Sequence, residues 1–528
     1  MTGFRGIRSF AQCNRMRPGT AARSCVRLVA LTLVTMFGPL PAEGQQAYDI
    51  GSSNQIFLDG RFLAERENVR IVVQPPRKTG ERNIVAGVHK MVAGEPLTVT
   101  DGPESSPYLQ VMENDGVFRG FRYISKNGVD WQWATKELLD AGDFAYGMRD
   151  SVHPRLTAYG VVFRDPHALP QQRYKIVSGW RNKVFASADG REWTAVHDNV
   201  FPKAALYPDG MDSQNIAFHD AAQGGYVAYV RVNDLIEVAP QLKDRCGEFG
   251  RCFLRAVGRS VTTDLASFPM PEIVLEADER DPRFDGLAES DFYMPQVLKY
   301  PHAQDAYVMF QNRYLHYRPW FIADDLSVYA PEGGRLNIGP LDIGFASSRD
   351  GIHWERYDRK PLIPLGPTGA FDSRGLYPVR GLIFRGDEMW LYFVTWDSHL
   401  SPRDGIGFRP TVSRTVFRRD GFTAVEADYT GGEFTTPPLE FEGGELHVNV
   451  DTSALGLLRV EVQDQQGKPI PGFSLDDCDR IHTTNSTSKT VRWRRESSLA
   501  ELTGREIRLR FELRFGAKLY SFRFGGRE

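Results

Sequence analysis

Between residues 48 and 428, apolar residues gather in short runs rich in β-branched and aromatic side chains, and Gly, Asp or Pro bounds each run. Residues 173–177, 226–230 and 306–310 are examples. Such runs are typical of β-strands. No segment of comparable length carries an apolar stripe with helical spacing. The pattern therefore predicts an all-β chain.

A turn motif, Ser-x-(Asp/Asn)-Gly-x-x-Trp, recurs along this region. Full copies begin at Ser125, Ser187 and Ser348, and degenerate copies begin at Thr262 and Arg418. Asp-Gly and Asn-Gly supply the positive φ of a tight hairpin turn, and the Trp starts the outgoing strand. One hairpin in every 60 to 90 residues suggests one four-stranded sheet per repeat. Five repeats predict a five-bladed β-propeller over residues 48–428.

The pattern changes near Asp428. Strict alternation of apolar and polar residues follows, as in residues 445–450, 457–462 and 519–524. Alternation places one face of each strand in a core and the other in water. Residues 429–528 are therefore predicted to form a β-sandwich.

The N-terminal segment resembles a secretory signal. Basic residues Arg23 and Arg27 precede an apolar run over residues 28–37, and small residues such as Ala42 and Ala47 follow. The apolar run is too short to span a bilayer. Residues 1–47 are predicted to be a signal peptide, so the mature chain is expected to be secreted or periplasmic, without a membrane span. An uncleaved anchor is the alternative.

Composition and cysteine content narrow the choice of partners. The chain has 528 residues, 41% hydrophobic and 25% charged, with a formal net charge of −3. A near-neutral surface does not favour nucleic acid as a partner. Cys246 and Cys252 could close a small disulfide loop, which leaves Cys478 unpaired. No spaced Cys/His cluster completes a zinc site, so neither a metal nor a cofactor is expected.

The main functional signal is a carboxylate that returns ahead of the first strand of most repeats. The first strands of propeller blades all start at one face, so these side chains should converge on one pocket. Glycoside hydrolysis needs two carboxyl groups, one ionised and one protonated. Asp212, Asp291 and Asp372 are the predicted catalytic residues, with roles left open, and Glu104 is an alternative proton donor. The predicted substrate-binding residues are Glu104, His153, Arg155, Gln214, Asn215, Tyr293, Arg374 and Trp396.

Several segments together resemble a known family. They are Ile-Phe-Leu-Asp at 56–59, Gln-Pro-Pro at 74–76, Asp-Ser-Gln-Asn at 212–215, Asp-Ser at 372–373, residues 470–478 and Leu-Tyr-Ser-Phe at 519–522. The chain thereby resembles bacterial secreted proteins of the glycosyl hydrolase family 32 N-terminal-like group. That group is similar in architecture to invertases, levanases and arabinanases, in which three propeller acids act as nucleophile or base, pKa modulator and general acid. The resemblance implies a glycosidase acting on a carbohydrate.

Two departures from the invertase sequence pattern bear on the expected substrate specificity. The motif Trp-Met-Asn-Asp-Pro-Asn and the Glu-Cys pair are both absent. Arg164-Asp165-Pro166 matches the Arg-Asp-Pro motif, but it follows the predicted strand 160–163 rather than preceding it. This position predicts a turn on the opposite face. Fructan specificity is therefore not expected.

Two other functions remain open. A carbohydrate-binding propeller without turnover needs aromatic platforms and polar contacts, but not two acids of opposite protonation. An interaction scaffold would instead show a large exposed apolar patch. The acids Asp476, Asp477 and Asp479 are interpreted as part of a solvated loop.

Overall fold

The computed structural model describes residues 47–85, 89–90, 98–99, 110–114, 117–120, 123–133, 160–179, 181–190, 193–206, 211–235, 253–284, 287–288, 290–315, 339–396, 407–408, 410–494 and 498–525. These residues form β-strands joined by turns and a few short 3-10 helices, which confirms the predicted all-β class. No helix among them is long and apolar enough to cross a membrane. The predicted signal peptide up to residue 46, and both Cys246 and Cys252, lie outside the described residues.

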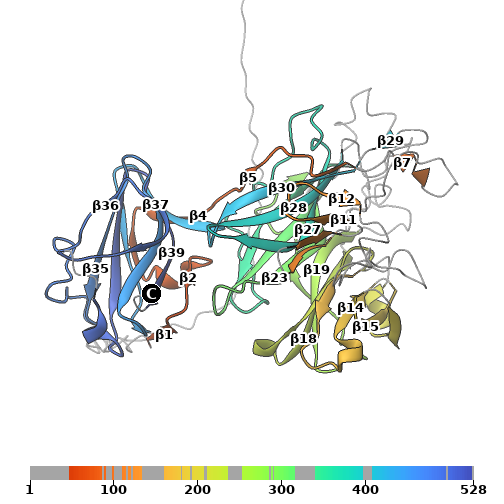
Figure 1. Ribbon diagram of the computed structural model, residues 1–528, viewed down its shortest axis with the longest axis horizontal. Helices are drawn as coiled ribbons and strands as arrows, with labels where there is room; N and C mark the ends of the chain where they lie inside the picture. Colours follow the sequence, from red (N-terminus) through yellow and green to blue (C-terminus); the bar gives the residue numbers. More distant parts are fainter. Residues whose placement is uncertain are drawn as a thin grey trace, which may run out of the picture. The chain divides into compact units, whose positions relative to one another are not determined.

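Three separate antiparallel sheets of four strands follow one another along the chain (Figure 1). In each sheet the strands pair in chain order. The first contains β9 (Val111–Asn114), β10 (Val117–Gly120), β11 (Tyr123–Ser125) and β12 (Gln132–Trp133). The second contains β13 (Val162–Arg164), β14 (Tyr174–Ser178), β15 (Lys183–Ser187) and β16 (Thr194–Asp198). The third contains β17 (Ile216–Asp220), β18 (Gly225–Leu235), β19 (Phe253–Thr262) and β20 (Glu272–Leu275).

Two further antiparallel units share one larger sheet, because a parallel pairing of Leu341 with Gly375 joins them. One unit contains β23 (Ser290–Lys299), β24 (Tyr307–Leu315), β25 (Leu341–Ile343) and β26 (Ala346–Ser348). The other contains β27 (Gly375–Arg385), β28 (Glu388–Trp396) and β30 (Thr411–Arg418), and its outer edge is β5 (Arg77–Lys78) with β6 (Ile84–Val85). Two N-terminal strands therefore complete the unit nearest the C-terminus.

The first strands of successive units lie next to one another. Strand β13 contacts β17, β17 contacts β23, β23 contacts β27, and β27 contacts β9. Gln110, just before β9, bridges to Arg380 of β27 and bonds the backbone of Val162 in β13 through its side-chain amide, with both bonds at 3.0 Å. Among the described residues, these contacts link the last unit back to the first.

The repeated turn has the same geometry in all three full copies. The glycines have φ of 72°, 77° and 73° at Gly128, Gly190 and Gly351. In each copy the first Ser hydroxyl accepts a hydrogen bond from the Gly N–H at 2.8–2.9 Å. The left-handed glycine closes the hairpin as the sequence predicts, and the Ser bond stabilises the turn further.

Two layers of antiparallel strands enclose an apolar core at the C-terminal end of the chain. One layer contains β37 (Asn485–Thr490), β34 (Glu445–Asp451), β39 (Lys518–Gly525), β31 (Thr423–Ala427), β4 (Val69–Val73) and β2 (Gln55–Ile56). The other contains β3 (Glu65–Glu67), β32 (Gly432–Thr435), β38 (Arg508–Arg514), β35 (Leu457–Gln463) and β36 (Ile481–His482).

N-terminal strands take part in these layers, which differs from the predicted boundary at residue 428. Strands β2, β3 and β4 pair with β39, β32 and β31, and the orange β1 (Tyr48–Gly51) lies among the blue strands in Figure 1, where it pairs with β33 (Leu439–Phe441). These pairings join residues at least 350 positions apart. The apolar and polar pattern of a strand shows which of its faces is buried, but it does not show which distant strand it pairs with.

Candidate functional site

A buried ion pair lies at the start of β23. The Asp291 carboxylate is 1% exposed, and its Oδ2 accepts hydrogen bonds from Arg255 Nη1 at 2.9 Å and from the Arg255 backbone N–H at 3.3 Å. Burial lowers the pKa of Arg255, but the nearby Asp291 carboxylate outweighs this effect and raises that pKa above its ordinary value. The pair therefore favours the charged form of Asp291.

Asp291 lies inside a strand, and not ahead of one. Strand β23 begins at Ser290, and Asp291 pairs with Tyr314 of β24. Ser290 and Asp291 are polar, so the apolar pattern of the sequence does not include them in the strand. They nevertheless pair with β24, and Arg255 of β19 neutralises the buried Asp291 carboxylate.

Three tyrosines surround this ion pair. The rings of Tyr314 and Tyr377 each lie 6.4 Å from Tyr293 in edge-to-face contact. The Arg255 guanidinium lies 5.6 Å from the ring centre of Tyr293 and 5.2 Å from that of Tyr314, and the Arg231 guanidinium lies 5.4 Å from that of Tyr293. Cation–π attraction strengthens as such groups lose water. Tyr293 was predicted to bind substrate, but it is 8% exposed and its ring contacts protein cations instead.

The loop before β17 carries Asp212, Gln214 and Asn215. Met211 N–H donates to the Arg231 carbonyl at 2.8 Å, and Asn215 Nδ2 donates to the carbonyls of Met211 and Ser213 at 3.0 Å. Asn215 therefore stabilises the loop. Asp212, also in this loop, is half-buried.

Gln214 reaches from this loop to β23. Its Oε1 accepts a hydrogen bond from Gln296 Nε2 at 2.7 Å, and both side chains are 1% exposed. In the described part of the chain, Gln214 Nε2 and Gln296 Oε1 have no hydrogen-bond partner. A buried amide pair with a spare donor and a spare acceptor suits a polar ligand or a water molecule.

Arg231 and Tyr293 connect the two regions. Arg231 holds the Asp212 loop by its backbone, while its guanidinium contacts Tyr293, two residues beyond Asp291. Tyr293 in turn contacts Tyr377 of β27. The structure thus brings the Asp212 loop, the start of β23 and the start of β27 around one cluster.

Asp372 has its described partners elsewhere. Its Oδ2 lies 2.6 Å from Lys78 Nζ, and Lys78 belongs to β5, at the opposite edge of the sheet unit from β27. Arg374 is half-buried, and its carbonyl accepts a hydrogen bond from the Leu341 N–H at 3.2 Å. The contacts that join Asp212 and Asp291 therefore do not include the Asp372 carboxylate.

Some of the predicted site residues fall beyond the described part of the chain. Glu104, His153 and Arg155 lie outside the described residues, as does the side chain of Trp396, whose backbone pairs with Gly375. Asp165 lies in the turn after β13, as predicted, and its Oδ1 accepts a hydrogen bond from Tyr226 at 2.9 Å. Within the described ranges, no group of three His, Cys, Asp or Glu side chains is arranged to hold a metal ion.

Sequence reasoning missed Arg231, Arg255, Tyr314 and Tyr377. It also missed a second buried pair, in which Arg313 Nε and Nη2 each lie 2.7 Å from the Asp342 carboxylate. An arginine within an otherwise apolar strand is a usable signal, because a buried cation needs a carboxylate or an aromatic partner. The sequence does not show which carboxylate or aromatic ring partners each arginine, because that partner lies on a different strand.

No protein-family model matches the sequence, and no curated protein matches it. Among solved structures, a glycoside hydrolase is similar at 11% identity, covering 65% of this chain and 92% of its own, with a TM-score of 0.37. A β-fructofuranosidase of family GH32 from Bombyx mori has 10% identity, coverage of 89% and 96%, and a TM-score of 0.31. An α-L-arabinanase from Cellvibrio cellulosa has 16% identity, coverage of 49% and 69%, and a TM-score of 0.28.

A GH32 β-fructofuranosidase and an arabinanase thus both occur among the similar structures.

Proposed function

We propose that the protein is a secreted glycoside hydrolase, built as a five-bladed β-propeller followed by a β-sandwich. The observation that carries this proposal is the Asp291–Arg255 pair, buried among three tyrosines where β17, β23 and β27 meet. Burying a charge is costly, and perturbed charged clusters of this kind concentrate at functional sites. The order of the first strands supports the propeller, and the resemblance to secreted glycosidases supports the substrate class.

The ion pair limits the roles within this site. A general acid must carry a proton near neutral pH, and Arg255 favours the ionised form of Asp291. Asp291 therefore suits electrostatic stabilisation, or the role of nucleophile or base. Asp212, half-buried and two residues before Gln214, is proposed as the acid, and Glu104 is the alternative.

A second candidate is a carbohydrate-binding protein without turnover. The observation in its favour is that both Asp291 and Asp372 are paired with cations, Arg255 and Lys78. Paired carboxylates can accept hydrogen bonds from sugar hydroxyls, and binding needs no protonated acid.

The test measures release of reducing ends from a panel of polysaccharides and of nitrophenol from nitrophenyl glycosides, with the chain from residue 48 onward. Asp291→Asn should lower turnover by at least about 100-fold, the usual scale for a positioned catalytic group, while calorimetry still detects glycan binding. Glu512→Gln is the matched control: Glu512 is a buried carboxylate paired with Arg459 at 2.6 Å in the C-terminal layers, and turnover should be unchanged.

Full turnover by a folded Asp291→Asn variant would overturn the catalytic role. Glycan binding without turnover by the parent protein would favour the second candidate. The amide oxygen introduced by Asp291→Asn can still accept one hydrogen bond from Arg255, so we expect this variant to fold. Thermal unfolding of each variant checks this and separates a loss of turnover from a loss of stability.

A further inference from the structure

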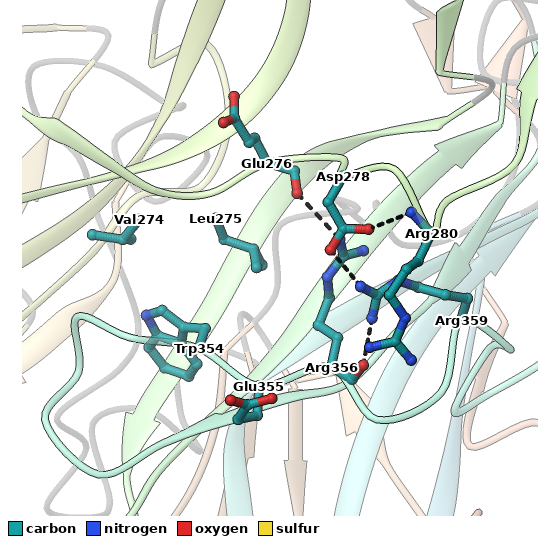
Figure 2. A pocket seen from close by; sticks show the side chains of 9 residues that line it. All are labelled: Val274, Leu275, Glu276, Asp278, Arg280, Trp354, Glu355, Arg356 and Arg359. Carbon is teal, nitrogen blue, oxygen red and sulfur yellow. Dashed lines mark hydrogen bonds and ion pairs between the residues drawn. The ribbon is translucent and has the colours of Figure 1, made fainter. Parts of the chain in front are cut away.

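A cavity lies between the end of β20 and the segment after the third repeated turn. Its volume is about 250 Å³. Figure 2 shows Trp354, Val274 and Leu275 along one side of it and a network of Asp278, Arg356 and Arg359 along the other. This volume is slightly below the roughly 300–1,000 Å³ of sites for drug-sized ligands, which suits a single sugar unit.

Trp354 departs from the other two tryptophans of the repeat. The indole N–H groups of Trp131 and Trp193 donate to the glycine carbonyl of their own turn, both at 3.1 Å. In the third copy Tyr229 donates to the Gly351 carbonyl at 2.7 Å, and Trp354 Nε1 has no hydrogen-bond partner among the described residues. The Trp354 indole is therefore not fastened to its turn, and its half-buried ring lines the cavity.

The opposite wall is held rigidly. The Arg356 side chain is 4% exposed, and its two terminal nitrogens lie 2.9 and 2.7 Å from the Asp281 carboxylate oxygens. Arg356 Nη2 also lies 3.0 Å from Asp278, which pairs with Arg359 as well. A fixed wall of this kind reduces the ordering cost of binding.

The charges of the lining favour a neutral ligand. Three arginines and three carboxylates line the cavity, so their formal charges cancel. The three exposed members, Glu276, Arg280 and Glu355, offer both donors and acceptors beside an aromatic ring. A pyranose or furanose ring has an apolar face and a rim of hydroxyls that both donate and accept, which matches this combination.

We propose that this cavity is a second carbohydrate-binding site, for one neutral sugar unit of a polysaccharide, with Trp354 stacking on the ring and Glu355 and Arg280 bonding its hydroxyls. The site needs no turnover and does not depend on the Asp291 cluster being catalytic. It would hold a polymer at the surface of the protein.

Affinity electrophoresis in gels containing xylan, arabinan, mixed-linkage β-glucan or polygalacturonate tests the proposal. The parent protein should be retarded by at least one of the three neutral polymers. Trp354→Ala should weaken that retardation about tenfold, which corresponds to about 1.4 kcal/mol. Glu355→Ala should weaken it too, and because Glu355 is exposed, this variant avoids the risk of misfolding.

Two control variants match these changes. Trp131→Ala removes the equivalent tryptophan of the first repeat, and Glu272→Ala removes an exposed carboxylate of β20 outside the lining; both should be retarded like the parent. Retardation by polygalacturonate alone, no retardation by any neutral polymer, or equal retardation of parent, Trp354→Ala and Glu355→Ala would each overturn the proposal. Loss of turnover in Asp291→Asn leaves these results unaffected, so the two proposals fail separately.

Discussion

Glycine at the fourth position of the repeated turn meets two separate demands. Gly351 has φ of 73°, and a Cβ built there would lie 2.5 Å from the Tyr229 hydroxyl oxygen, which bonds the Gly351 carbonyl. The Tyr229 ring also contacts Trp354 edge-on at 6.0 Å. In the first copy, Tyr392 bonds the Gly128 carbonyl and its ring contacts Trp131 at 5.7 Å. The turn thus closes its own hairpin and also contacts a tyrosine of a neighbouring sheet.

Gly351→Ala should lower the free energy of unfolding by about 2–4 kcal/mol, because a left-handed backbone costs a side chain about 1–2 kcal/mol and the clash adds to it. Gly224→Ala is the control, since Gly224 has the same φ of 73° but open space at the Cβ position. It should lose only the backbone part. Chemical denaturation measures both variants, and equal losses would contradict the role of the Tyr229 contact.

Asp420 of the fifth repeat is a buried acid with a raised pKa. It is 7% exposed and accepts a hydrogen bond from the Tyr300 hydroxyl, and burial raises its pKa above the ordinary value. The folded state therefore holds the proton of Asp420 more tightly than the unfolded state does. This group favours folding below its unfolded pKa, and the benefit disappears as pH rises through the raised folded pKa.

Asp420→Asn should remove that pH dependence. Asn suits the position because Asp420 has φ of 56°, where Asn is tolerated. The free energy of unfolding of the parent, relative to the variant, should fall as pH rises from about 3.5 to 7. A constant difference over this range would show that Asp420 has similar pKa values in both states.

At the scale of secondary-structure elements, a side chain links the first strands of two neighbouring sheets, β9 and β13. The Gln110 amide accepts a hydrogen bond from the Val162 N–H and donates one to the Val162 carbonyl, as a neighbouring strand would. Val162 is 4% exposed, so water cannot easily replace the amide. Among the described residues, β9 and β13 do not pair with each other, and the Gln110 side chain bridges them instead.

Gln110→Ala should lower the free energy of unfolding by about 1–3 kcal/mol, the cost of leaving buried polar groups unpaired. Gln466→Ala, at an exposed turn, is the control and should change stability by less than about 0.5 kcal/mol. Denaturant titration followed by tryptophan fluorescence measures both. Equal stability of parent and Gln110→Ala would show that the amide does not join the strands.

At the scale of the whole chain from residue 46 onward, polar contacts tie β30 to the C-terminal layers. Arg418 donates from Nε to Asn449 Oδ1 at 2.6 Å and from Nη2 to the Val450 carbonyl at 3.2 Å, and its guanidinium lies 4.8 Å from the Tyr520 ring centre. Burial lowers the pKa of Arg418. Arg418 begins the fifth copy of the turn motif, so a residue of the repeat also joins the two regions.

The amino-acid sequence by itself determined the strand class, the turn geometry and the order of the repeats, because these depend on local alternation, glycine backbone freedom and Asp or Asn side chains. It also pointed to Asp212 and Asp291, whose regions the structure joins through Arg231 and Tyr293.

Tertiary structure alone decided that Arg255 neutralises Asp291, that Lys78 engages Asp372, and that residues 48–73 pair with strands of the C-terminal layers. Each of these facts joins residues far apart in the chain. The free energy of such a contact depends on burial and on the distance between charges, and neither quantity exists until the chain has folded.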